Sequence, residues 1–271
     1  MENPFDPVQR LRVARIMRSK APKTSNPRWK AELNLMASQN ERCRQENPIT
    51  GFKDDACKCR MCPAYMTSKH AKPATKRLRA QFESVHPDRL FFGRLTFHAG
   101  KVKGNELRDA RRALLYALVR LTQSRVWRDS FLCWGGAVHL EWTPASKKHG
   151  AAGFNVHVHL ICEADEAPDI DAIKALWMRI VGEPTASPSD FFYFKKVNRL
   201  RCSATYAPHV RNLVPGLKED HRGRLMLDRM PVRDIFAFLD ATKGTHRLLR
   251  HGFSSLPGQR VQAKVSRRGA L

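Results

Sequence analysis

Two segments in the middle of the chain alternate between apolar and polar residues with the period of a β-strand. Residues 133 to 143 have the sequence CWGGAVHLEWT, and residues 154 to 162 have the sequence FNVHVHLIC. Because successive side chains of a strand point to opposite faces, the apolar residues of each segment share one face and the polar residues share the other. The pattern predicts two strands that fold back on each other as an antiparallel hairpin.

Further periodic segments flank this hairpin. Residues 89–97 (RLFFGRLTF) are bulky or β-branched and predict a strand, and residues 106–126 repeat apolar side chains at helical spacing. After the hairpin, residues 169–181 predict a second helix and residues 190–197 (DFFYFKKV) another strand. The order β-α-β-β-α-β predicts an α+β fold, an antiparallel sheet of the split β-α-β type with both helices on one face. We expect this domain to span residues 89–215.

Three side chains of the hairpin have metal-ligating chemistry: Glu141, His157 and His159. If the apolar faces of the two strands coincide, these side chains share one surface within cross-strand reach. Two imidazoles and a carboxylate suit a divalent cation such as Mn, Mg, Co or Ni, with positions left open for a substrate. The alternative is a half-exposed strand whose histidines face solvent. His139 shares the same face, either as a hydrogen-bonding neighbour of the ligands or as a plain surface histidine.

The segment NVHVHLI resembles the His-hydrophobic-His signature of the HUH endonucleases, a superfamily of rolling-circle replication initiators (Rep proteins), relaxases and certain transposases. GGAVHLEWT is similar to the Rep strand that supplies a third, acidic metal ligand, which would be Glu141 here. Residues 95–97 (Leu-Thr-Phe) are similar to the apolar-Thr-apolar first motif of Rep proteins. The resemblance implies a DNA-nicking enzyme that uses Mn or Mg, with the metal pair on a central strand facing away from the helices.

Tyr206 is the candidate nucleophile. It lies near the end of a short helix expected from about Asn198 to Ala207, since Pro208 disfavours helix in the residue before it. Rep proteins carry their nucleophilic tyrosine on a helix after the fourth strand, so the resemblance implies this role for Tyr206; a buried or stacking tyrosine is the alternative. It further implies a 5′-phosphotyrosyl intermediate and a free 3′-hydroxyl. Some Rep proteins place a glutamate one helical turn earlier, where this chain has Cys202.

Seven cysteines, an odd number, argue against a disulfide framework. Four of them fall in the basic N-terminal region expected over residues 1–88, namely Cys43, Cys57, Cys59 and Cys62. Their spacing is compatible with one tetrahedral structural zinc, with Cys43 favoured over His70 as the fourth ligand; a cluster of free thiols is the alternative. The segment 59–63 (CRMCP) is similar to a Cys-rich stretch that precedes the endonuclease domain of plasmid Rep proteins, although Tyr65 stands where a further cysteine is expected.

The chain is strongly basic, with 49 Lys and Arg against 25 Asp and Glu, a formal charge of +24. Such a charge predicts a polyanionic partner, and DNA is the one we expect. No apolar run approaches the roughly 18 residues of a membrane span, and the first residues lack the apolar stretch of a secretory signal. We therefore expect a cytoplasmic protein with no membrane contact. The cations expected to contact DNA lie around the last strand and the helix after it: Lys195, Lys196, Arg199 and Arg201.

These features favour a rolling-circle replication initiator, with a host helicase and polymerase as partners expected from the resemblance and a homodimer left open. An HUH-type relaxase, a single-tyrosine transposase or a nonenzymatic zinc-containing DNA-binding regulator are the alternatives. A regulator would need only the basic surface.

A helix expected between about Val8 and Lys20 has a positive face that is either solvated or in contact with DNA. Residues 216–271 are expected to form a basic helical extension and tail, with one helix opened by Pro231.

Overall fold

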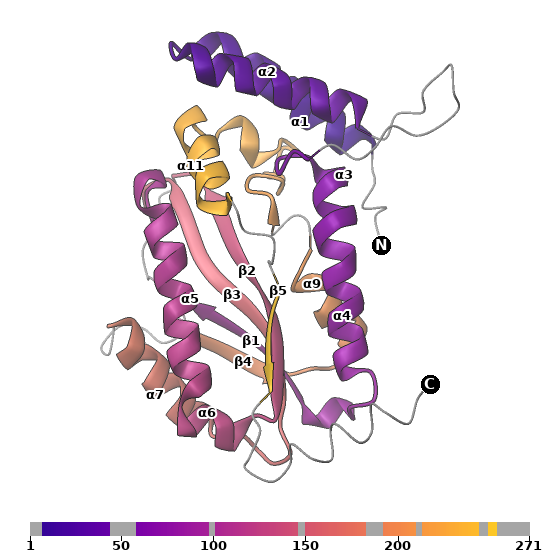
Figure 1. Ribbon diagram of the computed structural model, residues 1–271, viewed down its shortest axis with the longest axis vertical. Helices are drawn as coiled ribbons and strands as arrows, with labels where there is room; N and C mark the ends of the chain where they lie inside the picture. Colours follow the sequence, from indigo (N-terminus) through magenta and orange to yellow (C-terminus); the bar gives the residue numbers. More distant parts are fainter. Residues whose placement is uncertain are drawn as a thin grey trace.

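The computed structural model describes residues 7–43, 58–97, 101–145, 150–182, 192–209, 213–243 and 249–253 (Figure 1). Its centre is a five-stranded antiparallel sheet in the order β4-β1-β3-β2-β5. The strands are β1 (Leu90–Thr96), β2 (Cys133–Thr143), β3 (Gly153–Glu163), β4 (Phe192–Lys196) and β5 (Leu249–Phe253). The α+β class and the antiparallel sheet expected from the sequence are confirmed.

The β2–β3 hairpin determines which side chains share a face. Val138 lies opposite Val158 and His139 lies opposite His157, so the apolar residues of both strands fall on one side. That side is buried in the main hydrophobic core, which includes Val138 and Val158. The other side of the sheet carries the histidines and is called the histidine face below.

Three helices cover the apolar side of the sheet. They are α5 (Leu107–Gln123), α6 (Arg125–Ser130) and α7 (Ile170–Val181), drawn along one side of the sheet in Figure 1. Ser124 caps α6 by accepting a hydrogen bond from the Trp127 backbone N–H, and Asp169 caps α7 in the same way. Gly182 ends α7 with φ of 79°, a left-handed conformation that favours glycine.

Two further helices, α4 (Lys72–Phe82) and α9 (Leu200–Tyr206), pack on the histidine face. They form a second apolar cluster in which Leu78 and Phe82 of α4 join Phe92 and Ile161 of the sheet. The two helices that the sequence placed on one face, α5 and α7, do lie together on the apolar side, whereas α4 and its packing on the histidine face were not expected. The helix α4 places apolar residues four apart on one side, and β2 has a glycine where α4 approaches. A Cβ at Gly135 would come within 2.6 Å of a Leu78 methyl carbon.

The N-terminal helices α1 (Pro7–Lys20) and α2 (Pro27–Arg42) lie side by side at one end of the sheet, beyond α11 (Figure 1). Several cations of α1 are used inside the protein. Arg10 and Lys20 are buried and donate to backbone carbonyls, and the Arg18 guanidinium is 2.6 Å from the Glu41 carboxylate. Most of the cations on the positive face expected for this helix therefore bind groups of the protein itself.

The C-terminal part contributes to the sheet as well as a helix. The helix α11 (Val232–Thr242) packs on α5, and β5 pairs with β2 as an edge strand that the sequence did not predict. Contacts therefore cross the boundaries expected at residues 88 and 215. The basic tail expected at residues 261–271 lies outside the described residues. The remaining short elements are α3 (Pro63–Met66), a π-helical turn (Thr67–Ala71) and 3₁₀ turns at Ala21–Lys23, Pro87–Arg89, Gly104–Glu106 and Met226–Asp228.

Candidate metal centre

Three buried histidines meet on the histidine face. His139 comes from β2, and His157 and His159 come from β3; each has at most 4% of its surface exposed. His139 is the direct cross-strand partner of His157, and His159 is two residues further along the same face. One ligand atom from each of the three lies within 4.8 Å of the others. This triad could hold a metal ion. Among the described residues it is the group of three or more His, Cys, Asp or Glu side chains that lie close enough together for this.

Hydrogen bonding prepares the triad for an ion. The Nε2 of His139 lies 2.5 Å from the carbonyl oxygen of Ala207, to which it donates a proton in the tautomer that leaves Nδ1 unprotonated. A metal-ligating histidine usually donates its other N–H to such a carbonyl, which fixes the ring. Within the described part of the chain, the buried Nδ1 atoms of His139, His157 and His159 have no hydrogen-bond partner. Buried, unpartnered imidazole nitrogens fit a divalent cation, which binds neutral imidazole.

Burial keeps the three imidazoles neutral. It lowers the pKa of His157 to about 3, and it lowers the pKa of His139 and of His159 well below the ordinary histidine value. The positive side chains of Arg94 and Lys218 contribute to the lowering of the pKa of His157 and of His159. A histidine must be neutral to bind a metal, so at neutral pH the triad can bind an ion without first releasing protons.

Stability of the metal-free protein should therefore fall in acid. Between pH 6.5 and about 3 the unfolded chain binds protons at histidines that stay neutral when folded, so stability falls as pH decreases. Each such histidine contributes up to about 1.4 kcal/mol per pH unit. Urea unfolding in chelator at pH 7.5, 6.5 and 5.5 should show this slope, and His157→Gln should reduce it. The exposed His221 provides the comparison through His221→Gln, and an equal slope in both variants would contradict the interpretation.

Glu141, the acidic ligand expected from the sequence, lies on the same face but outside the triad. It is paired across the hairpin with Asn155, one step beyond the His139–His157 pair. Its carboxylate accepts a hydrogen bond from Lys218, a residue from the segment after α9. The structure thus brings His139 together with His157 and His159, and gives Glu141 a lysine partner. Cross-strand register is the signal that identifies His139.

Tyr206 lies beside the triad. It is the last residue of α9, and its ring stacks on the His159 ring with centroids 5.1 Å apart and an interplanar angle of 29°. The Tyr206 ring also contacts the ring of Phe92 in an edge-on arrangement, with ring centroids 6.0 Å apart. Half of the Tyr206 surface is exposed. The next residue, Ala207, accepts the hydrogen bond from His139, so the end of α9 is attached directly to the triad.

The four cations expected to contact DNA are all exposed: Lys195, Lys196, Arg199 and Arg201. Lys195 lies opposite Phe92 and therefore on the histidine face, with its Nζ 5.7 Å from the centre of the Tyr193 ring. Lys196 lies opposite Phe91 and points to the other side. Cys202 is exposed, one turn before Tyr206.

Two cations border the triad directly. Arg94 of β1 is the cross-strand partner of His159, and its Nε is buried without a hydrogen-bond partner among the described residues. Lys218 reaches the same area through its bond with Glu141. Because Glu141 offsets the charge of Lys218, Arg94 is the cation that leaves the site net positive, and this favours an anion such as a phosphate.

The cysteines expected to bind zinc are partly described. Cys43, Cys59 and Cys62 are buried, whereas Cys57 lies outside the described residues. Burial, with smaller contributions from Cys62 and Cys43, raises the pKa of the Cys59 thiol to about 12. His70 packs its ring edge-on against Tyr65, 5.5 Å away.

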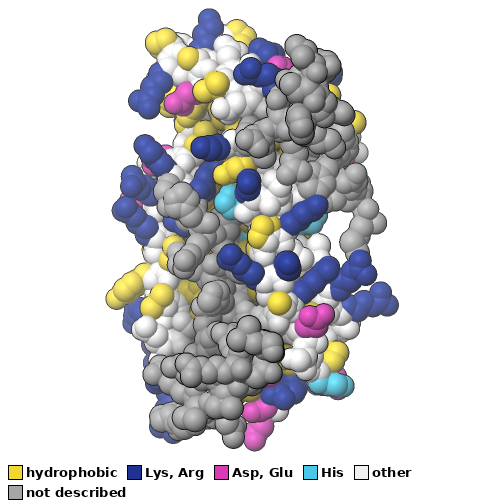
Figure 2. Space-filling view, turned by 45° about the vertical axis from the view of Figure 1, so that its right-hand side comes forward, with side chains coloured by type: hydrophobic (Ala, Val, Ile, Leu, Met, Phe, Trp, Pro, Cys, Tyr) yellow, Lys and Arg dark blue, Asp and Glu magenta, His cyan; other side chains and the backbone are white. Residues whose placement is uncertain are grey.

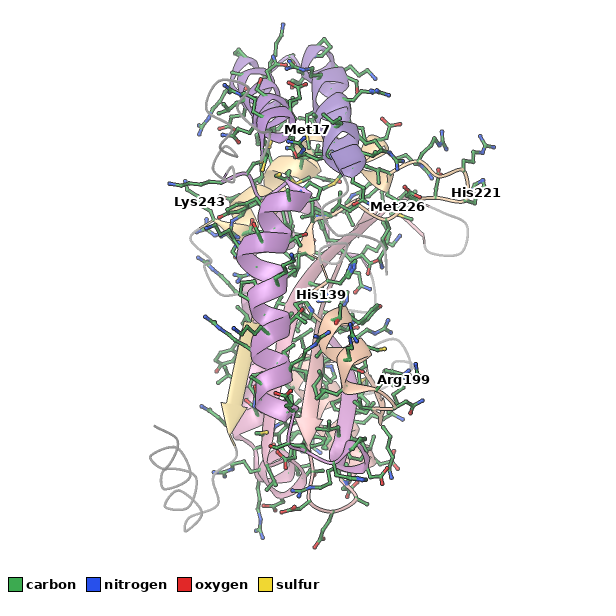
Figure 3. All side chains as sticks on the ribbon, turned by 90° about the vertical axis from the view of Figure 1, so that its right-hand side faces the viewer. Met17, His139, Arg199, His221, Met226 and Lys243 are labelled. Atoms are coloured by element: carbon green, nitrogen blue, oxygen red, sulfur yellow. The ribbon has the colours of Figure 1, made fainter. Side chains whose placement is uncertain are left out.

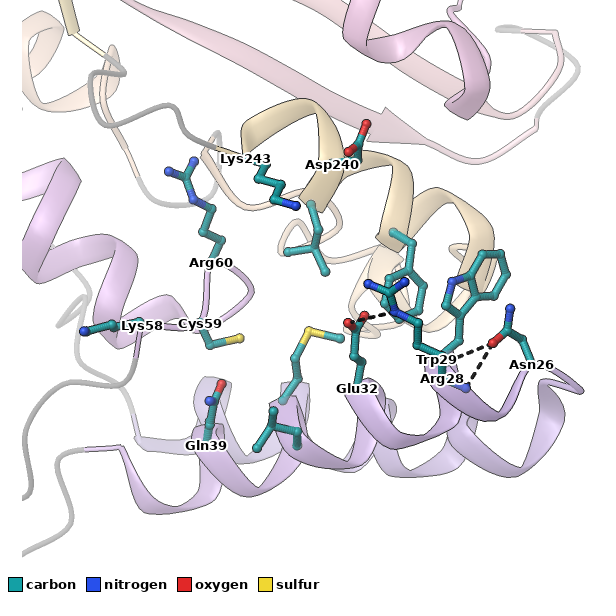
Figure 4. Close-up of a pocket in the computed structure, with 14 residues that line it drawn as sticks. Asn26, Arg28, Trp29, Glu32, Gln39, Lys58, Cys59, Arg60, Asp240 and Lys243 are labelled. Carbon is teal, nitrogen blue, oxygen red and sulfur yellow. Dashed lines mark hydrogen bonds and ion pairs between the residues drawn. The ribbon is translucent and has the colours of Figure 1, made fainter.

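A pocket of about 660 Å³ adjoins the cysteines, between α2 and α11 (Figure 4). One wall is the stacked pair of Trp29 and Phe236, with ring centroids 5.0 Å apart. Cys59 directs its sulfur into the pocket, and Arg60 and Lys243 lie near its rim.

No protein-family model, curated protein or solved structure matches the chain. Among the described residues, none of the helices has the length and apolarity needed to cross a bilayer.

Proposed function

We propose that this protein is a metal-dependent DNA-nicking enzyme of the HUH type that initiates rolling-circle replication. The observation that carries the proposal is a half-exposed tyrosine stacked on one of three buried, neutral histidines. The hydrogen bond from His139 to Ala207, the residue after Tyr206, holds the end of this helix beside the same cluster. A nucleophile beside a cation site is the arrangement that phosphoryl transfer requires.

The proposed reaction is a transesterification. The Tyr206 hydroxyl oxygen loses its proton and attacks the scissile phosphorus in line; the bond from phosphorus to the 3′ oxygen breaks, and that oxygen leaves as a 3′-hydroxyl. Arg94 and Lys218, the two cations beside the triad, would bind the non-bridging phosphate oxygens. A divalent cation such as Mn or Mg held by His139, His157 and His159 would add Lewis-acid stabilisation of the same oxygens.

In this proposal His139 takes the place that the sequence assigned to Glu141. Glu141 then acts at a distance from the ion by holding Lys218 near the phosphate. All three proposed ligands are imidazoles, a set that binds Mn, Co, Ni and Zn more readily than Mg.

Within the nicking class, replication initiation is favoured by the segment 59–63, which is similar to the Cys-rich stretch before the endonuclease domain of plasmid Rep proteins, and the products are compatible with it. One phosphodiester is exchanged for another, so the cut strand can be rejoined without ATP, and the free 3′-hydroxyl can prime a polymerase. The strand order and the β-α-β-β-α-β succession of β1 to β4 support a split β-α-β domain of the HUH kind. A host helicase and polymerase are the partners that this function would need.

A covalent-adduct assay tests the proposal without knowledge of the target sequence. Purified protein is incubated with Mn²⁺ or Mg²⁺ and a labelled pool of randomised single-stranded oligonucleotides, then separated under denaturing conditions. We expect a labelled protein band that depends on the metal and carries DNA joined through its 5′ phosphate. Absence of any adduct from protein that binds both metal and DNA would contradict the proposal.

We propose a structural zinc at the cysteines as a separate site of this protein. Three buried cysteines, Cys43, Cys59 and Cys62, support it, and Cys57 would complete the expected set of four ligands. Metal analysis should find about one zinc per chain, and Cys59→Ser or Cys62→Ser should remove it and lower the unfolding temperature. The exposed Cys202 supplies the control, because Cys202→Ser should retain the zinc. Equal zinc content in all variants would disprove the site.

A further inference from the structure

The positive charge of the chain is unevenly distributed. Two described segments, residues 58–82 and residues 192–209, contain no aspartate or glutamate. Their basic residues are Lys58, Arg60, Lys69, Lys72, Lys76, Arg77 and Arg79 in the first, and Lys195, Lys196, Arg199 and Arg201 in the second. The first segment precedes the sheet and includes α4, and the second comprises β4 and α9.

The fold brings these two segments together on the histidine face. Leu78 and Phe82 of α4 share an apolar cluster with Ala204 of α9. The guanidinium of Arg79 donates a hydrogen bond of 3.1 Å to the Thr205 hydroxyl, one residue before Tyr206. In Figure 3, α4 crosses in front of the sheet, and His139 lies beside the middle of this helix on the side of α9. Both acid-free helices therefore border the candidate site.

Four cations on the outer side of these helices are exposed and are called the α4–α9 surface: Lys76, Arg77, Arg199 and Arg201. Among the described residues, none of the four is paired with a carboxylate. On the opposite layer some cations are paired, as Arg112 is with Asp109 and Arg125 with Asp129, whereas Arg120 and Arg179 have no carboxylate partner among the described residues. Figure 2, which brings the α4 side forward, shows many more Lys and Arg side chains than Asp and Glu.

We infer that the α4–α9 surface binds the backbone phosphates of the DNA that enters the Tyr206 site. Unpaired cations repel one another and cost folding free energy, and an anionic partner along both helices offsets this repulsion. The Arg79–Thr205 hydrogen bond joins α4 to α9, the helix that carries Tyr206. The inference rests on the proposed function only in taking DNA as the polyanion that reaches this face.

The physical signature of such a surface is the salt dependence of binding. Each phosphate contact releases counterions, and it steepens the negative slope of log affinity against log salt by about 0.7 for single strands and by about 0.9 for duplexes. Loss of two phosphate contacts should therefore reduce the slope by about 1.4 or about 1.8. Loss of two cations elsewhere should leave it nearly unchanged.

The test compares matched pairs of substitutions in a Tyr206→Phe background, which separates binding from cleavage. The first pair is Lys76→Gln with Arg77→Gln, and the matched control is Arg120→Gln with Arg179→Gln on α5 and α7. Both pairs remove two exposed positive charges. Fluorescence anisotropy with a labelled single-stranded oligonucleotide and with a labelled hairpin is measured from 50 to about 300 mM salt. Circular dichroism checks that each variant retains the wild-type helix content.

We expect the α4 pair to weaken binding at least about tenfold at low salt and to reduce the slope by more than one on at least one of the two DNAs. The DNA that shows the larger change identifies whether single-stranded or duplex phosphates lie on α4. Equal affinities and slopes for the α4 pair and the control pair would overturn the inference. If protein that keeps Tyr206 bound DNA normally but formed no covalent adduct, the proposed nicking function would be contradicted. The inference that the α4–α9 surface binds DNA would then still hold.

Discussion

Replacement of Tyr206 by phenylalanine is expected to abolish the covalent protein–DNA adduct and to reduce nicking by at least about 10³-fold. The substitution removes only the hydroxyl, so the ring can keep its stacking on His159 and its edge contact with Phe92. Loss of a nucleophile commonly costs this much or more, because no other group then forms the covalent bond. Gel analysis of the adduct and single-turnover rates of strand cleavage measure the effect.

A matched tyrosine makes this prediction specific. Tyr193 is also exposed, on the edge strand β4, and has its ring against Lys195. Tyr193→Phe should keep the adduct within a few-fold of the wild-type yield. If Tyr206→Phe still formed the adduct and Tyr193→Phe did not, the nucleophile would be Tyr193, and peptide mapping of the labelled adduct would identify it directly.

Substitution of any histidine of the triad by alanine is expected to remove the divalent metal and to lower the nicking rate at least about 100-fold. Each imidazole contributes one of three ligands, and binding to the remaining two is much weaker. Cobalt titration followed by absorbance gives the affinity, and nicking with saturating Mn²⁺ gives the rate. His139→Ala, His157→Ala and His159→Ala should behave alike.

Glu141→Gln distinguishes the two ligand sets. If the triad alone holds the ion, this isosteric change should reduce metal affinity by less than about tenfold, because it weakens only the bond from Lys218. A loss as large as that of His157→Ala would make Glu141 a ligand, and His139→Ala would then be the milder variant. Thermal unfolding in chelator shows whether any variant is simply misfolded.

Local sequence determined the elements of this protein that have a regular period. The alternation in residues 133–143 and 154–162 places each side chain on a definite face of its strand, since the period of two leaves no other choice once the apolar face is buried. Helices with an apolar stripe or a clear capping residue, such as the one after Asp169, were also predictable. The α+β class follows from their order.

Tertiary structure alone decided which side chains from different elements meet, because the periodic pattern does not determine these contacts. His139 rather than Glu141 joins His157 because the pairing register depends on two strands together, and Lys218, 77 residues after Glu141, supplies the partner of that carboxylate. The helix α4 packs on the histidine face because Leu78 fits over Gly135, a contact between distant segments that no local period encodes. Residue spacing determines which way a side chain points within its own element, whereas only the packed chain determines what it meets there.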